Sequence, residues 1–257
     1  MIRNGTRADL AAIGELLGRV NDSPYDIRAV AEEKVFGDGF SGPPRVRVFD
    51  DGGAIRGVAV SCGKYLRILG VDREYRRRGI GSELLRDSSA TVNAAEAGNY
   101  FTPGVVESDV GTIAFLRAEG FREKSATWNL ECSTGDSDRA GRALAAGETP
   151  TLLEFVKQHF GPVWAFEAAR ARSAFYIPDR GFAVVEANNR GLGTFGPIGV
   201  VESMRGHGHG KELLLAALSE LRRLGYQRAI IPWTDALDFY RNHCGAEPAH
   251  RFLTFTR

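Results

Sequence analysis

The sequence lacks any long apolar segment. No run of about 18 apolar residues occurs in its 257 residues, and the first ten, MIRNGTRADL, contain no apolar core of signal-peptide length. These absences argue against a membrane span and against a cleaved leader. We therefore expect a cytoplasmic protein without a membrane partner.

Cysteine is scarce, and neither sign of charge dominates. The three cysteines, Cys62, Cys132 and Cys244, are widely spaced and form no C-x-x-C pair, so we expect free thiols rather than a disulfide framework or a zinc site. Lys and Arg number 33 against 32 Asp and Glu, a net charge of +1. Such a balance gives no field that would favour nucleic acid as a partner.

The chain contains an internal repeat. Its composition, 43% hydrophobic and 25% charged, is that of a globular protein long enough for one or two domains. The segments 71–85 and 200–214 align without a gap, and an Arg, two Gly, a Glu and a Leu pair fall in register. Residues 133–150 between the copies show little apolar periodicity. The sequence therefore predicts two domains, 1–132 and 150–257, joined by a linker over 133–149.

Hydrophobic periodicity and turn residues predict a mixed α/β structure for both copies. In the first copy the predicted helices are 6–20, 82–97 and 111–119, and the predicted strands are 45–50, 55–61, 65–71, one near Val105, and 127–132. In the second copy the predicted helices are 152–159, 164–172, 211–224 and 236–243, and the predicted strands are 174–177, 182–187, 192–201, 228–232 and 251–256.

Each copy of the repeat places Arg-x-x-Gly-x-Gly between a strand and a helix. Glycines allow the backbone to approach an anion, and the free N–H groups at the start of the helix point toward it. The nucleotide P-loop has Lys-Ser/Thr after its glycines and the dinucleotide fold has Gly-x-Gly-x-x-Gly, and neither pattern occurs here. The turns therefore predict phosphate binding of another kind.

Both turns resemble the pyrophosphate-binding motif of the GNAT acetyltransferases. The likeness continues at 114–121 and 238–246, which resemble the late helix of that family. It implies a tandem pair of GNAT-like domains, each with a mixed sheet, and acetyl-coenzyme A (acetyl-CoA) as co-substrate without a metal. The residues implied in binding it are Val200, Val201, Arg205, Gly206, His207, Gly208, His209, Gly210 and Lys211, with Val71, Arg76, Arg77, Arg78, Gly79, Ile80 and Gly81 in the first copy.

The pair His207 and His209 has the spacing of two zinc ligands. They occupy variable positions of the phosphate turn, and the sequence places no third ligand beside them. We therefore interpret them as polar lining near phosphate rather than as a metal site.

The resemblance also implies which copy performs chemistry. The late-helix position that holds the family's usual acid, a tyrosine, is Tyr240 in the second copy and Leu116 in the first, and leucine cannot donate a proton. The family's oxyanion donor, a backbone N–H before the turn, falls at Val200. Glu186 and Asp235 are candidates for the base, and a chain of water molecules is an equal alternative.

The acceptor implied by the resemblance is a small-molecule amine. The end of the second copy resembles tandem GNAT proteins that acetylate glucosamine or glucosaminides, and the layout is similar to mycothiol synthase, so an amino sugar is favoured. Trp233 either stacks on a sugar face or packs in the core. The alternatives are a non-catalytic acetyl-CoA sensor and an acetyltransferase for aminoglycosides, polyamines or peptides.

Overall fold

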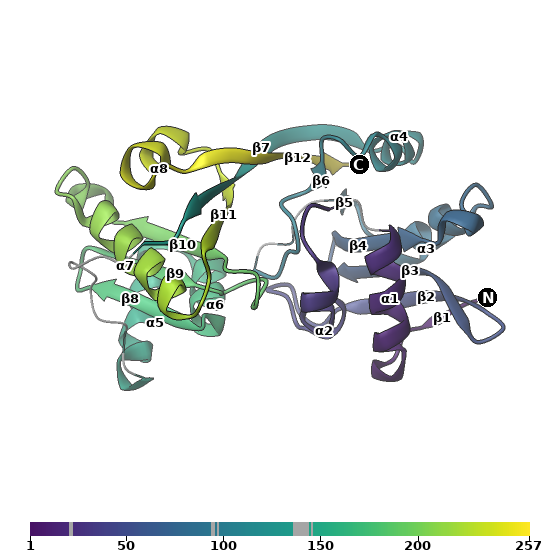
Figure 1. Cartoon of the computed structure of the whole chain (residues 1–257). Helices are drawn as coiled ribbons and strands as arrows, with labels where there is room; N and C mark the ends of the chain where they lie inside the picture. The colour runs from purple at the N-terminus through teal and green to yellow at the C-terminus, as the bar shows by residue number, and fades with distance from the viewer. Residues whose placement is uncertain (21–22, 94–95, 97, 136–143, 145) are drawn as a thin grey trace. The chain divides into compact units, whose positions relative to one another are not determined.

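The chain forms two compact units in a computed structural model that describes residues 1–20, 23–93, 96, 98–135, 144 and 146–257 (Figure 1). Unit 1 comprises residues 1–127 and 250–257, and unit 2 comprises residues 128–249. The chain enters unit 2 within β7 (Arg122–Ser133) and returns to unit 1 within β12 (Glu247–Thr256). The last strand therefore contributes to the first unit, which a division into consecutive halves does not anticipate. Most of the expected linker, residues 136–143 and 145, lies outside the described residues.

Unit 1 is built on one mixed sheet. The strands β1 (Ile2–Asn4), β2 (Arg45–Asp51), β3 (Ala54–Cys62) and β4 (Tyr65–Val71) are antiparallel neighbours. Beyond them lie β5 (Val92–Asn93), which is parallel to β4, and the end of β12, which pairs with β5 and with β6 (Val105–Val106). The strands predicted at 45–50 and 55–61 form a hairpin, β2 and β3. Gly52 and Gly53 form its turn with φ of +62° and +91°, values that glycine adopts without strain.

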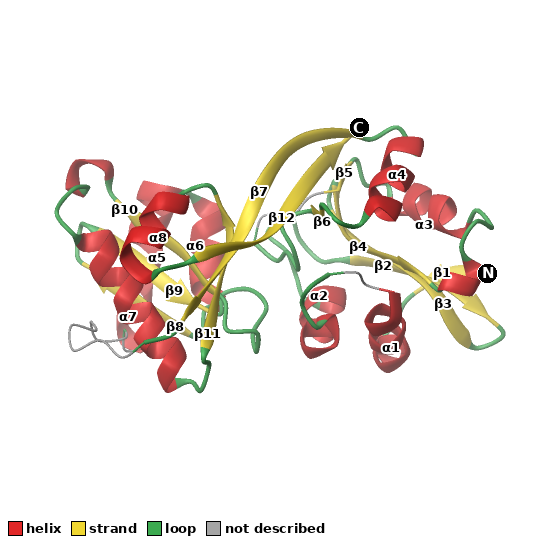
Figure 2. Ribbon diagram, turned by 45° about the horizontal axis from the view of Figure 1, so that its top comes forward, coloured by secondary structure: helices red, strands yellow, loops and turns green. Residues whose placement is uncertain are grey.

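Two pairs of helices cover this sheet. The helices α1 (Leu10–Val20) and α2 (Ala31–Phe36) lie on one side of the strands, and α3 (Ile80–Ser88) and α4 (Val110–Ala118) lie on the other (Figure 2). The apolar face of α1 is buried as its periodicity predicts, through Ile13, Leu16, Leu17 and Val20. The core beneath α3 and α4 includes Leu84, Leu85 and Leu116.

The helix predicted over 82–97 is wrong from residue 89 to residue 93, and residues 94, 95 and 97 lie outside the described part of the chain. Helix α3 ends at Ser88, because Ser89 adopts a left-handed φ of +57° and the Ser88 hydroxyl donates a hydrogen bond to the Leu85 carbonyl. The next residues form β5, which pairs with β4 and β12. Helical propensity is overridden here by strand pairing. The short elements α2, β1 and β5 were not predicted.

Unit 2 contains a three-stranded antiparallel sheet and a strand pair. The sheet has the order β10 (Phe195–Val200), β9 (Gly181–Val185), β8 (Ser173–Ile177), and β11 (Arg228–Thr234) pairs with the end of β7. One apolar cluster joins β9 to α5 (Thr149–Phe160) and α6 (Pro162–Arg170). The other joins the strands to α7 (His209–Arg223) and α8 (Leu237–Cys244). Strand β9, buried along its whole length, separates the two clusters.

We predict that Leu116→Ala destabilises unit 1. The Leu116 side chain is fully buried in α4, so its truncation leaves a cavity that costs about 2 to 5 kcal/mol. Val110 in the same helix is 74% exposed and serves as the control, because Val110→Ala removes almost no buried surface. Urea unfolding of both variants measures the difference. Equal midpoints would contradict this account of the core.

Candidate active site

Each unit contains two parallel strands that meet at one point and then diverge. In unit 2, β10 and β11 meet through a bridge between Thr194 and Ile230. In unit 1, β4 and β5 meet through Tyr65 and Val92. The repeat that aligns Val71 with Val200 also aligns Tyr65 with Thr194, since both lie six residues earlier. Both units thus place the same fork directly before the Gly-rich turn.

The outer edge of β10 presents backbone groups that β9 does not use. The Val201 N–H donates a hydrogen bond of 2.8 Å to the Arg180 carbonyl on the β9 side. Backbone groups alternate in direction along an antiparallel strand, so the N–H and C=O of Val200 point away from β9. The Arg205 guanidinium accordingly donates to the Val200 carbonyl at 3.3 Å. Arg76 makes the same contact with the Val71 carbonyl at 3.1 Å in unit 1.

The two Gly-rich turns have the same backbone shape. Gly208, with φ of +86°, directly precedes α7, and Gly79, with φ of +80°, directly precedes α3. Two residues earlier, Gly206 has φ of +79° and its counterpart Arg77 has φ of +63°. This shape directs the unpaired N–H groups at the start of each helix toward the turn, where the helix dipole favours an anion.

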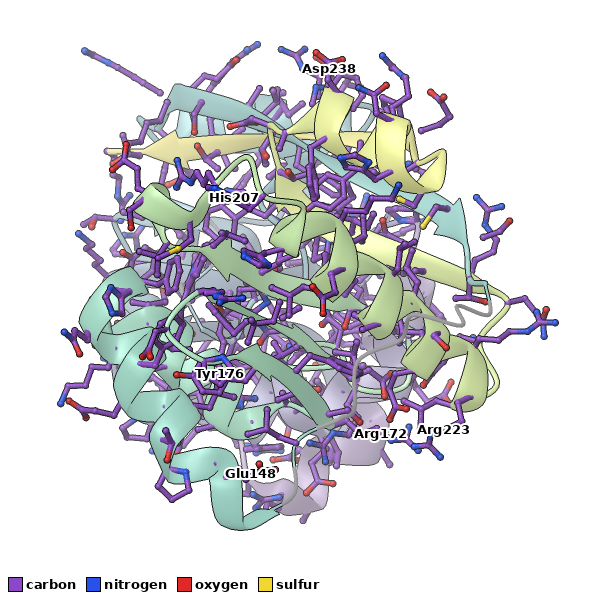
Figure 3. The ribbon with its side chains drawn as sticks, turned by 90° about the vertical axis from the view of Figure 1, so that its left-hand side faces the viewer. Glu148, Arg172, Tyr176, His207, Arg223 and Asp238 are labelled. Carbon is purple, nitrogen blue, oxygen red and sulfur yellow. The ribbon has the colours of Figure 1, made fainter. Side chains whose placement is uncertain are left out.

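The side chains of the unit 2 turn are mostly exposed. His207 lies on the loop that leads into α7 (Figure 3), and its ring nitrogen Nδ1 lies 2.9 Å from the Arg205 carbonyl. The His207 and His209 rings stack with centroids 6.3 Å apart, and His209 Nδ1 lies 3.8 Å from a Glu212 carboxylate oxygen. Arg205 and Lys211 are exposed. Within the described part of the chain, no group of three or more His, Cys, Asp or Glu side chains is arranged to hold a metal.

The packing behind the turns fixes the correspondence between α4 and α8. A β-carbon added to Gly210 would lie 3.3 Å from the Phe239 ring, and one added to Gly81 would lie 3.4 Å from the Phe115 ring. Phe115 and Phe239 therefore occupy the same place in the two units. The next residues, Leu116 and Tyr240, are equivalent by structure as well as by sequence.

Tyr240 is buried beside the fork of unit 2. Its side chain is 6% exposed, and its ring lies edge-on to Phe195, the first residue of β10, with centroids 6.1 Å apart. Burial raises the pKa of the Tyr240 phenol above its ordinary value of 10, and a hydrogen bond with Thr234 opposes this shift. The phenol is therefore protonated throughout the physiological pH range.

Glu186 lies at the far end of the β9–β10 hairpin from Val200. Six strand positions separate Val200 from Thr194, whose carbonyl accepts the Glu186 N–H, which corresponds to roughly 20 Å. The buried Glu186 carboxylate accepts hydrogen bonds from the Gly191 and Gly193 N–H groups at 2.8 and 3.2 Å and pairs with Arg172 at 3.1 Å. The structure thus engages both of its oxygens in holding the loop.

Trp233 sits in a strained segment of β11. Its φ is +53°, and the ladder with β7 is irregular between Ile231 and Thr234. The Trp233 N–H donates to Asn129 Oδ1 at 3.0 Å, and the residue is 41% exposed. Such bulges redirect side chains at functional sites. Asp235, two residues later, is exposed. Sequence patterns did not reveal Asn129, because only tertiary structure brings it beside Trp233.

The described helices include none that is both long and apolar enough to cross a membrane. Residues 152–246 match the model of the acetyltransferase (GNAT) family, whose general reaction is acetyl transfer from acetyl-CoA to an amine. No curated protein matches the chain by sequence.

Solved structures resemble the whole chain. A fungal GCN5-related glucosamine N-acetyltransferase region, within a multi-domain β-N-acetylglucosaminidase, matches with a TM-score of 0.77 at 17% identity and covers 100% of this chain, which spans 38% of that protein. A GCN5-related N-acetyltransferase from Sphaerobacter thermophilus matches with a TM-score of 0.68 at 18% identity, over 100% and 95% of the two chains. A tandem GNAT protein from the clavulanic acid biosynthesis pathway also gives 0.68, at 16% identity, over 100% and 98%. Residues 152–246 therefore match the GNAT family, and the whole chain has a fold similar to that of solved GNAT proteins, a tandem member included.

Proposed function

We propose that unit 2 transfers the acetyl group of acetyl-CoA to a primary amine of a small molecule. The observation that carries this proposal is a difference between the two units at one equivalent position. Both units have the fork and the phosphate turn, but only unit 2 has a proton donor, Tyr240, where unit 1 has Leu116. Unit 1 is then a catalytically silent copy.

The residues of unit 2 fit acetyl-CoA. The pyrophosphate binds the N–H groups at the start of α7 and the Arg205 cation, with Lys211 and the two histidines beside it. The outward N–H and C=O groups of β10 form hydrogen bonds with the extended arm of acetyl-CoA, as a neighbouring strand would. The Val200 N–H and its neighbours on this edge are the donors for the carbonyl oxygen as negative charge develops on it.

The reaction needs one bond formed, one broken and two proton transfers. The amine nitrogen bonds to the acetyl carbon as the carbon–sulfur bond breaks, and the sulfur takes a proton from the Tyr240 phenol. The amine releases its proton to water, because the Glu186 carboxylate is already engaged and lies far along the hairpin. Asp235, exposed after β11, is the alternative acceptor of that proton.

We propose an amino sugar such as glucosamine as the acceptor. The exposed Trp233 ring offers a face on which a sugar can stack, and the fungal protein similar in fold is described as a glucosamine N-acetyltransferase region. A thiol-release assay with glucosamine, a polyamine, an aminoglycoside and a peptide tests the proposal. Acetyl-CoA binding without release of thiol for any amine would instead favour a sensor.

We predict that Arg205→Ala raises the KM for acetyl-CoA about 10- to 100-fold. The variant removes a charge-assisted contact to phosphate and leaves the helix and its glycines in place. The matched control is Arg76→Ala, which removes the equivalent cation from the silent unit and leaves the KM unchanged. Steady-state kinetics compare the two variants. A larger effect of Arg76→Ala would mean that unit 1 is the active copy.

We predict that Tyr240→Phe lowers kcat about 100-fold and leaves the KM for acetyl-CoA nearly unchanged. Only the proton for the departing sulfur is lost, and a thiol with a pKa near 8.5 leaves fairly well unaided. Because the Tyr240 pKa is raised above 10, its titration causes no loss of wild-type activity below pH 10.

The control for this variant is Tyr226→Phe. Burial and a hydrogen bond to Glu186 raise the pKa of Tyr226 to about 12, so it is a second shielded phenol of unit 2 that lies away from β10's open edge. Tyr226→Phe keeps its turnover. Full activity of Tyr240→Phe would show that another group supplies the proton.

A further inference from the structure

One strand position differs sharply between the two forks. Four residues before Val71 lies Arg67 on β4, and four residues before Val200 lies Gly196 on β10. Both lie within an irregularity of the ladder that their strand forms with the preceding strand. The two residues are therefore equivalent, although they differ more in size and charge than any other pair on these strands.

Arg67 fills the space on its side of unit 1. The side chain is fully buried, with Nε donating to Glu96 at 3.0 Å. One terminal nitrogen donates to the carbonyls of Lys34 and Gly37, at 3.1 and 2.8 Å, at the end of α2. The flanking residues Leu66 and Ile68 are buried as well. The guanidinium thus ties the end of α2 to the middle of β4.

The same place in unit 2 is open. Gly196 has φ of +107°, and among the described residues no atom beyond its two chain neighbours lies within 4 Å of the position that a β-carbon would occupy. Gly196, Pro197 and Ile198 are half-buried, whereas their counterparts in the middle of β4 are mostly buried. Gly196 directly follows Phe195, whose ring lies edge-on to that of Tyr240.

Polar contacts tie the loop before β10 to α6. The Asn188 amide donates a 2.6 Å hydrogen bond to the carboxylate of Glu167 on α6, and the Asn188 carbonyl accepts from the hydroxyl of Thr194, two residues before Gly196. Asn188 is 4% exposed, and its side-chain oxygen Oδ1 has no hydrogen-bond partner within the described residues. A buried acceptor of this kind is costly unless something donates to it.

We propose that the space beside Gly196 receives the acceptor, with Asn188 Oδ1 and the Glu167 carboxylate accepting hydrogen bonds from it. Both groups accept and the carboxylate is anionic, so they favour a small primary amine that carries further hydroxyl or ammonium donors. Arg67 occupies the counterpart of this space and excludes an acceptor from unit 1 even when its turn holds a phosphate. The inference rests on the proposed function and adds the residues that select the acceptor.

The first experiment compares Gly196→Leu with Gly196→Ala. Both variants carry the strain of a side chain at φ +107°, so their difference reports the bulk placed in the space. We expect Gly196→Leu to lower kcat/KM for glucosamine at least 30-fold below Gly196→Ala, with calorimetric affinity for acetyl-CoA alike in the two. Equal kcat/KM values in the two variants would overturn the proposal.

The second experiment needs no change at a strained position. Asn188→Leu removes the unpartnered oxygen and keeps the volume, and the acceptors compared are glucosamine and cyclohexylamine, which lacks hydroxyl groups. We expect kcat/KM for glucosamine to fall about 10-fold relative to that for cyclohexylamine. Equal losses for both amines would assign Asn188 a purely structural role and overturn its part in selection.

The acceptor site and the proposed function are refuted by different results. The acceptor site alone is refuted if the wild-type protein releases thiol with glucosamine but the Gly196 and Asn188 variants do not show the differences in kcat/KM given above. Absence of thiol release with every amine by a protein that binds acetyl-CoA refutes the proposed function, and the acceptor site with it.

Discussion

The bridge between Thr194 and Ile230 is the interaction on which the proposed site of unit 2 depends. The bridge joins β10 to β11 at one end only. Between the bridge and the Gly-rich turn, the N–H and C=O groups on the outer edge of β10 therefore pair with no neighbouring strand of the described chain. An unpaired strand edge normally invites aggregation unless something covers it. Here the edge leads directly to the start of α7, and an extended, phosphate-bearing molecule can satisfy both the edge and the helix.

Under the proposed function unit 1 is the silent copy, although its backbone closely repeats that of unit 2. Its fork, its Arg76 contact and the packing of Phe115 on Gly81 repeat those of unit 2 closely. Two differences bear on the proposed chemistry. Leucine replaces the phenol of Tyr240, and Arg67 replaces the open space beside Gly196. The buried pair of Arg67 and Glu96 further ties the sheet to α2, so this unit has gained internal contacts where unit 2 leaves room.

The features that could be predicted from the sequence depend on the spacing of residues within short segments. The glycines of the turns, the apolar face of α7 and the alignment of Leu116 with Tyr240 depend on short segments, and the packing of Gly81 and Gly210 confirms that alignment. The role of Glu186 was not predictable in the same way, because its partners Arg172 and Gly191 are met only in the folded loop. The end of α3 and the left-handed backbone of Trp233 likewise depend on strand pairing.

The loop between β9 and β10 is a further difference between the two units. Unit 1 joins β3 to β4 through Gly63 and Lys64 alone, whereas unit 2 uses nine residues, 186–194, for the same connection. A connection of that length can fold inward only if its backbone groups find partners, and the Glu186 carboxylate supplies them by accepting the Gly191 and Gly193 N–H groups. The loop so held delivers Asn188 to Glu167 beside the open strand. Glu186, which by residue type was a candidate base, thus holds the loop that carries Asn188, a residue of the acceptor site proposed above.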